Sequence, residues 1–286
     1  MRLTNKQKLP QPLVDAVKND GYTKGNADIS VTELLKPPMQ RALEIKHEAE
    51  LEEDVSDRIF SLLGQTIHSI LERSETEGIA ERRLSIKING WTVSGGMDRF
   101  VSRDGLLQDY KLTTVYKTKD KNIPEEWCKQ LNIYAEMLRE NGDEVKKLEV
   151  VCIYRDWSKG AAERDNEYPQ RQVEVIEIPL IEPKEVRAFI EERVKLHQEA
   201  AKGNYEPCTK EERWAKDDQW AVMREGRKTA IKLHFSELHA NLHKDELGKG
   251  HFVEKRPGKS TKCESYCPVK KQCEYYNKFL KQKGEE

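Results

Sequence analysis

The sequence predicts an α/β protein in which helices pack on a mixed sheet, followed by a small cysteine-rich module. The turn-forming pairs Asn89-Gly90 and Asp104-Gly105 each separate two runs of strand-forming residues, which predicts a sheet built from hairpins. Apolar residues recur at helical spacing between about residues 57 and 77, which predicts a long amphipathic helix. Strands interleaved with such helices are typical of a sheet covered by helices.

The chain before the sheet is predicted to be mostly helical. Residues 1–28 are rich in Lys, Asn and Pro, and we expect a flexible N-terminal segment there. A short docked helix is expected within residues 29–35, and the break at Pro37-Pro38 precedes a charged helix that continues to about Glu53. The long amphipathic helix then runs to about Glu77.

The sheet and its covering helices are predicted between about residues 84 and 202. Pro124 begins a helix that stops at Asn141-Gly142, and Pro183 begins another that ends near Lys202. We therefore place one core at residues 29–204. Its strands are predicted over 84–88, 91–93, 97–102, 106–112, 148–154 and 172–178.

From about Tyr205 the sequence changes character. This part holds four of the six cysteines, a hairpin predicted around residues 224–227, a helix near residues 236–247 and a basic tail. Residues 205–286 are therefore predicted to form a cysteine-rich module that packs on the core.

Composition limits the classes of function. The net charge is −1 and 35% of residues are charged, so any site for a polyanion must be a local patch. Mean hydropathy is −0.85, and no apolar run approaches membrane-spanning length. Because the N-terminus has no apolar signal-peptide core, we expect a cytoplasmic protein, and in a reducing compartment its cysteines favour metal ligation or burial over disulfides.

The second hairpin carries the most informative side chains. With a two-residue turn at Asp104-Gly105, cross-strand partners have numbers that sum to 209, so Asp98 is predicted to lie opposite Lys111. Asp109 lies on the same face as Lys111, two residues earlier. Two carboxylates and an ammonium on one patch favour Mg²⁺ binding and metal-assisted hydrolysis of a phosphate ester, although a solvated acidic turn is the plain alternative.

These residues and two flanking helices resemble a known superfamily. Asp98 followed by Asp109-Tyr110-Lys111 is similar to the PD-(D/E)XK nuclease motif, in the variant whose first Asp sits in a Gly-x-x-Asp turn. The run around His68 is similar to the metal-binding helix of the RecB-like branch. Gln130 and Tyr134 match that branch's Gln-x-x-x-Tyr motif.

The resemblance implies a restriction-endonuclease-like fold and a nuclease site. It implies Mg²⁺ or Mn²⁺ held by His68, Asp98, Asp109 and the carbonyl of Tyr110, with Lys111 positioning the nucleophile. It also places Gln130 and Tyr134 beside the active site. Ordinary helix packing is the alternative for the helical residues. Three lysines after the second strand are expected to contact the nucleic-acid backbone: Lys117, Lys119 and Lys121.

The cysteines predict a second metal centre. Three follow the spacing C-x₃-C-x₅-C, at Cys263, Cys267 and Cys273, and Cys208 is the fourth ligand by elimination, because Cys128 and Cys152 fall in a predicted helix and strand. Four thiolates suit either Zn²⁺ or a [4Fe–4S] cluster. Some RecB-like nucleases hold such a cluster, which favours iron–sulfur, but their first cysteine precedes the histidine helix and this sequence has none there.

The leading hypothesis is a metal-dependent DNA nuclease, more exonuclease than endonuclease, acting on single strands or duplex ends. Small phage-type RecB-like nucleases of this kind act in recombination, repair or DNA processing, which implies a recombination or replication protein as partner. Two alternatives stay open: a non-catalytic DNA- or partner-binding protein on the nuclease fold, and a cluster-responsive regulator. The sequence leaves strand preference, polarity and oligomeric state open.

Overall fold

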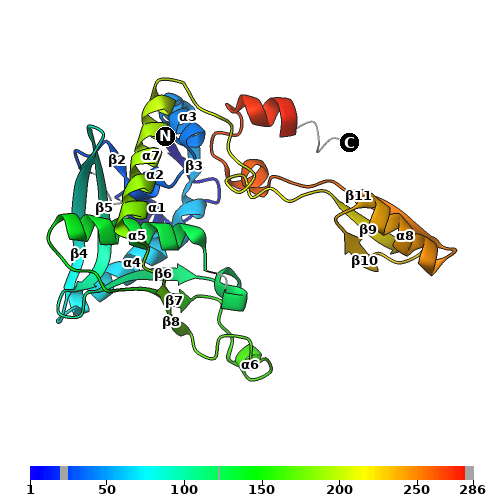
Figure 1. The fold of residues 1–286 in the computed structure, drawn as a ribbon, viewed down its shortest axis with the longest axis horizontal. Helices are drawn as coiled ribbons and strands as arrows, with labels where there is room; N and C mark the ends of the chain where they lie inside the picture. Colours follow the sequence, from blue (N-terminus) through cyan, green and yellow to red (C-terminus); the bar gives the residue numbers. More distant parts are fainter. Residues whose placement is uncertain (20–24, 122, 281–286) are drawn as a thin grey trace. The chain divides into compact units, whose positions relative to one another are not determined.

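The computed structural model describes residues 1–19, 25–121 and 123–280, without the side chains of residues 119–121. The chain forms two compact units (Figure 1). The first contains residues 1–36 and 52–204, and the second contains residues 37–51 and 205–286. Within the described residues, no helix is both long enough and apolar enough to cross a membrane.

A six-stranded mixed sheet forms the centre of the first unit, which confirms the predicted fold class. Five strands follow the order β2-β5-β6-β7-β8, and β4 pairs with β5. The β2–β5 and β6–β7 pairs are parallel and the others antiparallel. The strands are β2 (Ile29–Ser30), β4 (Ile79–Ile88), β5 (Trp91–Val101), β6 (Leu106–Thr113), β7 (Lys147–Tyr154) and β8 (Val173–Ile178).

Helices pack on this sheet and seal its core. The helix α5 (Glu125–Glu140) contacts β4, β6 and β7 and also packs against α7 (Pro183–Ala201), as Figure 1 shows. The amphipathic helix α4 (Ile59–Ser74) lies against β6. Burial of apolar side chains between these layers is the main source of stability. The largest fully buried side chains include Phe100, Leu107, Leu131, Ile133 and Tyr154.

The N-terminal segment carries secondary structure that the sequence did not predict. Strand β1 (Arg2–Thr4) pairs in parallel with β3 (Glu52–Asp54), and α1 (Gln11–Lys18) buries Val14 and Val17 in a small apolar cluster with Val55. This packing is long-range in sequence, so a local reading of residues 1–28 as flexible could not detect it. The short helix α2 (Val31–Leu34) begins with a capping box, in which Ser30 and Glu33 cap each other's backbone.

The second unit contains a three-stranded antiparallel sheet in the order β10-β9-β11, packed against α8 (Glu237–Leu247). Its strands are β9 (Gln219–Arg224), β10 (Lys232–His234) and β11 (His251–Arg256). The helix α3 (Pro38–Lys46) also belongs to this unit, whereas the sequence placed it in the core. The reason is apolar packing: Met39 and Leu43 of α3 cluster with Val269 and Cys273.

Candidate active site

The hairpin between β5 and β6 has a different register from the predicted one. Its turn contains four residues, because Val101 pairs with Leu106 and cross-strand partners sum to 207 rather than 209. Only Gly105 of the Asp104-Gly105 pair has a positive φ, +61°, so the two-residue type I′ turn does not form. The carbonyl of Gly105 instead accepts hydrogen bonds from Lys146 and Lys147, at the start of β7.

This register removes Asp98 from its predicted place opposite Lys111. The β5–β6 ladder ends at the pair Arg99 and Gln108, and Asp98 comes next along β5. There the backbone N–H of Tyr110 donates to Oδ2 of Asp98 at 2.6 Å, so a carboxylate takes the place of a backbone acceptor. The predicted Gly-x-x-Asp turn is also absent, since residues 95–98 lie inside β5.

The buried Asp109 forms an ion pair with the half-buried Lys111 on β6. Lys111 Nζ lies 2.8 Å from Oδ2 of Asp109, whose side chain is 3% exposed. The same ammonium donates to Oε1 of Gln130 on α5 at 2.9 Å, and Nε2 of Gln130 donates to the Tyr134 hydroxyl at 3.1 Å. The structure thus links these four predicted residues in one chain of contacts.

The electrostatics of this pair follow from its burial. Burial raises the pKa of Asp109 to about 6, against the opposing influence of Lys111. Burial alone would lower the pKa of Lys111, but the neighbouring Asp109 outweighs it, and the net pKa is raised. Lys111 is therefore protonated at neutral pH.

His68 faces the outer edge of the same site. Its Nδ1 lies 3.3 Å from Oδ1 of Asp98 and 3.2 Å from Oε1 of Glu81. Hydrogen bonding to Asp98, and then to Glu81, raises the pKa of His68 to about 10. The ring also meets that of Tyr110 edge to face, with 6.3 Å between centroids.

Glu81 is a member of the site that sequence reasoning missed. Among the described residues, His68, Glu81 and Asp98 form a group whose ligand atoms all lie within 4.8 Å of one another. Glu81 belongs to the first residues of β4, a stretch that the sequence did not identify as strand. Its polar composition, Glu81-Arg82-Arg83, gives no local signal of a site.

A glycine in β5 lets the helix with the Gln-x-x-x-Tyr motif approach the sheet. A Cβ on Gly95 would lie 2.4 Å from Cε1 of Tyr134 and 2.9 Å from a methyl of Val31. Any side chain there would therefore displace Tyr134 or the neighbouring Val31. Tyr134 itself is 3% exposed, so it also serves as core packing.

The lysines that were predicted to bind nucleic acid follow β6 in the 3₁₀ helix η3 (Val115–Lys121). Lys117 is exposed and lies 3.8 Å from Glu126. The side chains of Lys119 and Lys121 fall outside the described residues. Tyr116, beside Lys117, is 82% exposed.

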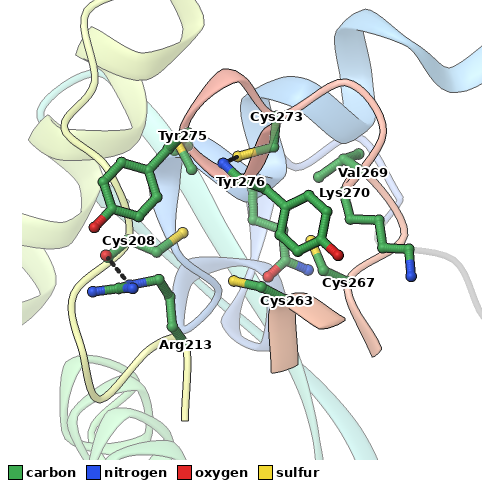
Figure 2. Close-up of a pocket in the computed structure, with 11 residues that line it drawn as sticks. Cys208, Arg213, Cys263, Cys267, Val269, Lys270, Cys273, Tyr275 and Tyr276 are labelled. Atoms are coloured by element: carbon green, nitrogen blue, oxygen red, sulfur yellow. Dashed lines mark hydrogen bonds between the residues drawn. The ribbon is translucent and has the colours of Figure 1, made fainter. Parts of the chain in front are cut away.

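In the second unit, one pocket is lined by the four predicted cysteines, Cys208, Cys263, Cys267 and Cys273 (Figure 2). The pocket lies beside the apolar cluster of α3 and Val269, and Tyr275 and Tyr276 also line it. Cys152 is instead buried in β7, and Cys128 lies half-buried on α5.

Backbone contacts and burial shape this pocket. Arg213 Nε donates to the carbonyl of Cys208 at 3.0 Å, and the backbone N–H of Tyr276 donates to Sγ of Cys273 at 3.4 Å (Figure 2). Burial raises the pKa of Cys208 to about 12 and that of Cys263 to about 11. Without a bound cation these thiols are protonated at neutral pH.

Comparison with known proteins identifies the family to which this chain belongs. Residues 26–274 match the model of the PD-(D/E)XK nuclease superfamily. Among solved structures, the protein SSO0001 aligns with 19% identity and a TM-score of 0.44, over 65% of this chain and 85% of that one. A candidate exonuclease from Eubacterium rectale aligns with 15% identity and a TM-score of 0.34, over 50% of this chain and 54% of that one.

No curated protein matches the sequence significantly. The superfamily match nevertheless spans most of the chain and includes His68, the Asp98 and Asp109 strands, Lys111 and all four pocket cysteines. This protein belongs to the PD-(D/E)XK nuclease superfamily.

Proposed function

We propose that this protein is a metal-dependent deoxyribonuclease, most active as an exonuclease on single strands or duplex ends, in DNA recombination, repair or phage DNA processing. The observation that carries the proposal is the ion pair of the buried Asp109 with Lys111, linked to Gln130 and lying next to the carboxylate of Asp98. Isolating such charges in a protein core is costly. A core that needed only stability would be served better by apolar residues.

The donor set fits a divalent metal ion, and nucleases of this superfamily use such ions. Carboxylate oxygens are the ligands that Mg²⁺ and Mn²⁺ prefer, and an imidazole nitrogen is compatible with Mn²⁺. Under the proposal His68, Asp98, Asp109 and the carbonyl of Tyr110 hold one or two ions. A bound cation would lower the pKa of a water ligand and neutralise charge that develops on the phosphate.

Lys111 has the geometry of a residue that positions a nucleophile. An ammonium group has three donors, and the described contacts of Lys111 use two of them, to Asp109 and Gln130. The third donor can hold a water or a phosphate oxygen. Because Asp109 and Gln130 fix the ammonium, little reorganisation is needed when charge builds up on the substrate.

Contacts with the DNA backbone are proposed for Lys117, Lys119 and Lys121, which follow β6 directly. Lys117 is exposed, and its partner Glu126 is exposed as well, so exchange of that ion pair for a phosphate costs little. Such contacts are independent of sequence and sensitive to salt. They match an enzyme that degrades DNA without a recognition sequence.

We further propose that Cys208, Cys263, Cys267 and Cys273 hold a structural [4Fe–4S] cluster, with Zn²⁺ as the alternative. Their common pocket supports four ligands, and the N–H that Tyr276 donates to Cys273 would stabilise a thiolate there. The role is to hold together α3 and the C-terminal segment, which meet at this pocket.

One experiment tests the nuclease proposal. The full-length protein is incubated with labelled linear and circular DNA, single- and double-stranded, in Mg²⁺ or Mn²⁺, and with EDTA. We expect degradation of linear DNA that stops in EDTA and falls at least about 100-fold in Asp109→Ala and Lys111→Ala.

The control variant is Lys159→Ala, which removes a lysine that is 82% exposed and lies outside the site, and should keep full activity. Circular dichroism confirms that each variant is folded. Full activity in folded Lys111→Ala would overturn the proposal. DNA binding without cleavage by the wild type under all conditions would instead support a non-catalytic binding protein.

A further inference from the structure

Glu81 has a left-handed backbone conformation, which is unusual in a β-strand. Its φ is +48°, although it lies inside β4 and is not a glycine. L-residues avoid this left-handed region because Cβ crowds the backbone. Of the other described non-glycine residues with positive φ, Asn89 lies in a turn, where such a conformation is common.

The conformation interrupts the ladder between β4 and β5 at one position. Ala80 pairs with Arg99 and Arg82 pairs with Met97, so Glu81 is the residue that would face Asp98, and the described ladder skips this pair. Strained backbone persists only where the surrounding structure holds it, and such outliers gather at functional sites.

The consequence of the strain is the position of the Glu81 carboxylate. Oε1 lies 3.2 Å from Nδ1 of His68, and it falls within 4.8 Å of the ligand atoms of both His68 and Asp98. The side chain is 32% exposed, whereas that of Asp98 is 10% exposed. The three donors therefore converge from a helix and two strands on a point that solvent and substrate can reach.

The charges around this point also favour the binding of a cation. Lys111 contacts Asp109 and Gln130, so the two carboxylates of Glu81 and Asp98 are matched by one positive charge at most, that of the His68 ring between them. Like charges at this separation repel each other, and a divalent cation would match two carboxylates.

We propose that Glu81 is a protein ligand of the divalent cation, together with His68 and Oδ1 of Asp98. This inference rests on the proposed metal dependence and adds a third carboxylate to the site. The left-handed backbone at Glu81 is retained because it aims this carboxylate at the cation. A role limited to orienting His68 through the hydrogen bond is the structural alternative.

The test measures Mn²⁺ binding to the full-length protein without DNA, by titration calorimetry and electron paramagnetic resonance, together with melting of the metal-free protein. Glu81→Gln keeps a hydrogen-bond acceptor for His68 but loses the anionic ligand. Glu81→Gly loses the ligand and relieves the backbone strain. Glu77→Gln is the matched control, because this glutamate precedes β4 and its side chain is 64% exposed.

We expect both Glu81 variants to bind Mn²⁺ at least about 10-fold more weakly than the wild type. Glu81→Gly should melt at an equal or higher temperature, and Glu77→Gln should bind normally. Normal Mn²⁺ affinity in Glu81→Gln overturns the proposal. If Glu81→Gln binds normally and Glu81→Gly binds weakly, the role of Glu81 is to orient His68. A lower melting temperature in Glu81→Gly would also count against it, because the conformation would then serve the fold.

Asp98→Asn separates this inference from the proposed function. If Asp98→Asn weakens Mn²⁺ binding and Glu81→Gln does not, the nuclease proposal stands and the role of Glu81 fails. If the wild type binds no Mn²⁺, both fail.

Discussion

The site on the central sheet and the cysteine pocket are organised in opposite ways. On the sheet, Asp109 is paired with Lys111, and Asp98 with His68, before any metal binds. In the pocket, burial raises the pKa of Cys208 and Cys263, so these two side chains are neutral thiols at neutral pH. The sheet site consists of hard oxygen and imidazole donors, and the pocket of soft sulfur.

This difference predicts that a metal would contribute to catalysis at the sheet site and to folding at the cysteine pocket. The central sheet has its own large apolar core, so the first unit is expected to fold without a cation. The pocket lies in a small cluster formed mainly by Met39, Leu43, Leu51 and Val269. A metal bound there would have to displace protons from the thiols, and its binding energy would then add to the folding free energy of the second unit.

The largest effect should come from removing a pocket ligand. Cys273→Ser is expected to abolish bound iron or zinc and to destabilise the second unit by about 5 kcal/mol or more. Hydrogen–deuterium exchange should show lost protection in residues 205–280 and unchanged protection in residues 79–154. Metal analysis and a visible spectrum after anaerobic purification distinguish iron–sulfur from zinc.

Cys128→Ser is the control for this comparison, since Cys128 lies on α5 in the first unit and should leave the metal content unchanged. Equal protection of the second unit in Cys273→Ser and the wild type would show that the pocket does not depend on a metal.

A smaller loss of stability is expected when Lys111 is removed, and it should be seen in the metal-free protein. In metal-free Lys111→Met, Asp109 is left as an unpaired buried carboxylate, which costs about 3–5 kcal/mol at pH 8. The folded pKa of Asp109 is about 6, above the value of about 3.9 for an unfolded chain. The folded state therefore binds more protons in this window, and its stability falls as pH rises through it.

Loss of Lys111 raises the pKa of Asp109 further, so the deficit of Lys111→Met should shrink as pH falls from 8 towards 4. Urea unfolding at several pH values measures how this deficit changes with pH. Adding Asp109→Asn to Lys111→Met should remove most of the change with pH. A deficit that does not vary with pH would show that lost packing, rather than a buried charge, destabilises the variant.

The smallest effect concerns the turn that sets the register of the site. Gly105 and Gly90 both have positive φ, +61° and +82°, so Ala should cost about 1–2 kcal/mol at either. At Gly105 a Cβ would also lie 3.0 Å from the carbonyl of Glu144 and 3.1 Å from the N–H of Lys146, whereas Gly90 has open space. Gly105→Ala should therefore lose about 1 kcal/mol more.

Thermal unfolding of Gly105→Ala and Gly90→Ala gives this difference directly. Equal losses would show that crowding against Glu144 and Lys146 does not constrain the turn. A larger loss in Gly105→Ala, with reduced nuclease activity, would tie the register to the active site.

Sequence patterns predicted the elements whose signals are local. The helix over Glu125–Glu140 follows from Pro124 at its start and Asn141-Gly142 at its end. The hairpin at Asn89-Gly90 has the predicted two-residue turn, with Ile88 paired to Trp91. Asp98, Asp109 and Lys111 were chosen as site residues because the motif needs those residue types in that order, and their catalytic role stays a prediction.

Tertiary structure decided what local signals leave open. Asp104-Gly105 gives the same hairpin signal as Asn89-Gly90, yet β7 binds the carbonyl of Gly105 and the turn lengthens to four residues. A shift in cross-strand pairing moves Asp98 from Lys111 to the N–H of Tyr110. The strained Glu81 and the packing of α3 beside the cysteines depend on contacts between segments far apart in sequence. The sequence by itself determined which chemical groups are available, and long-range packing decided which of them meet.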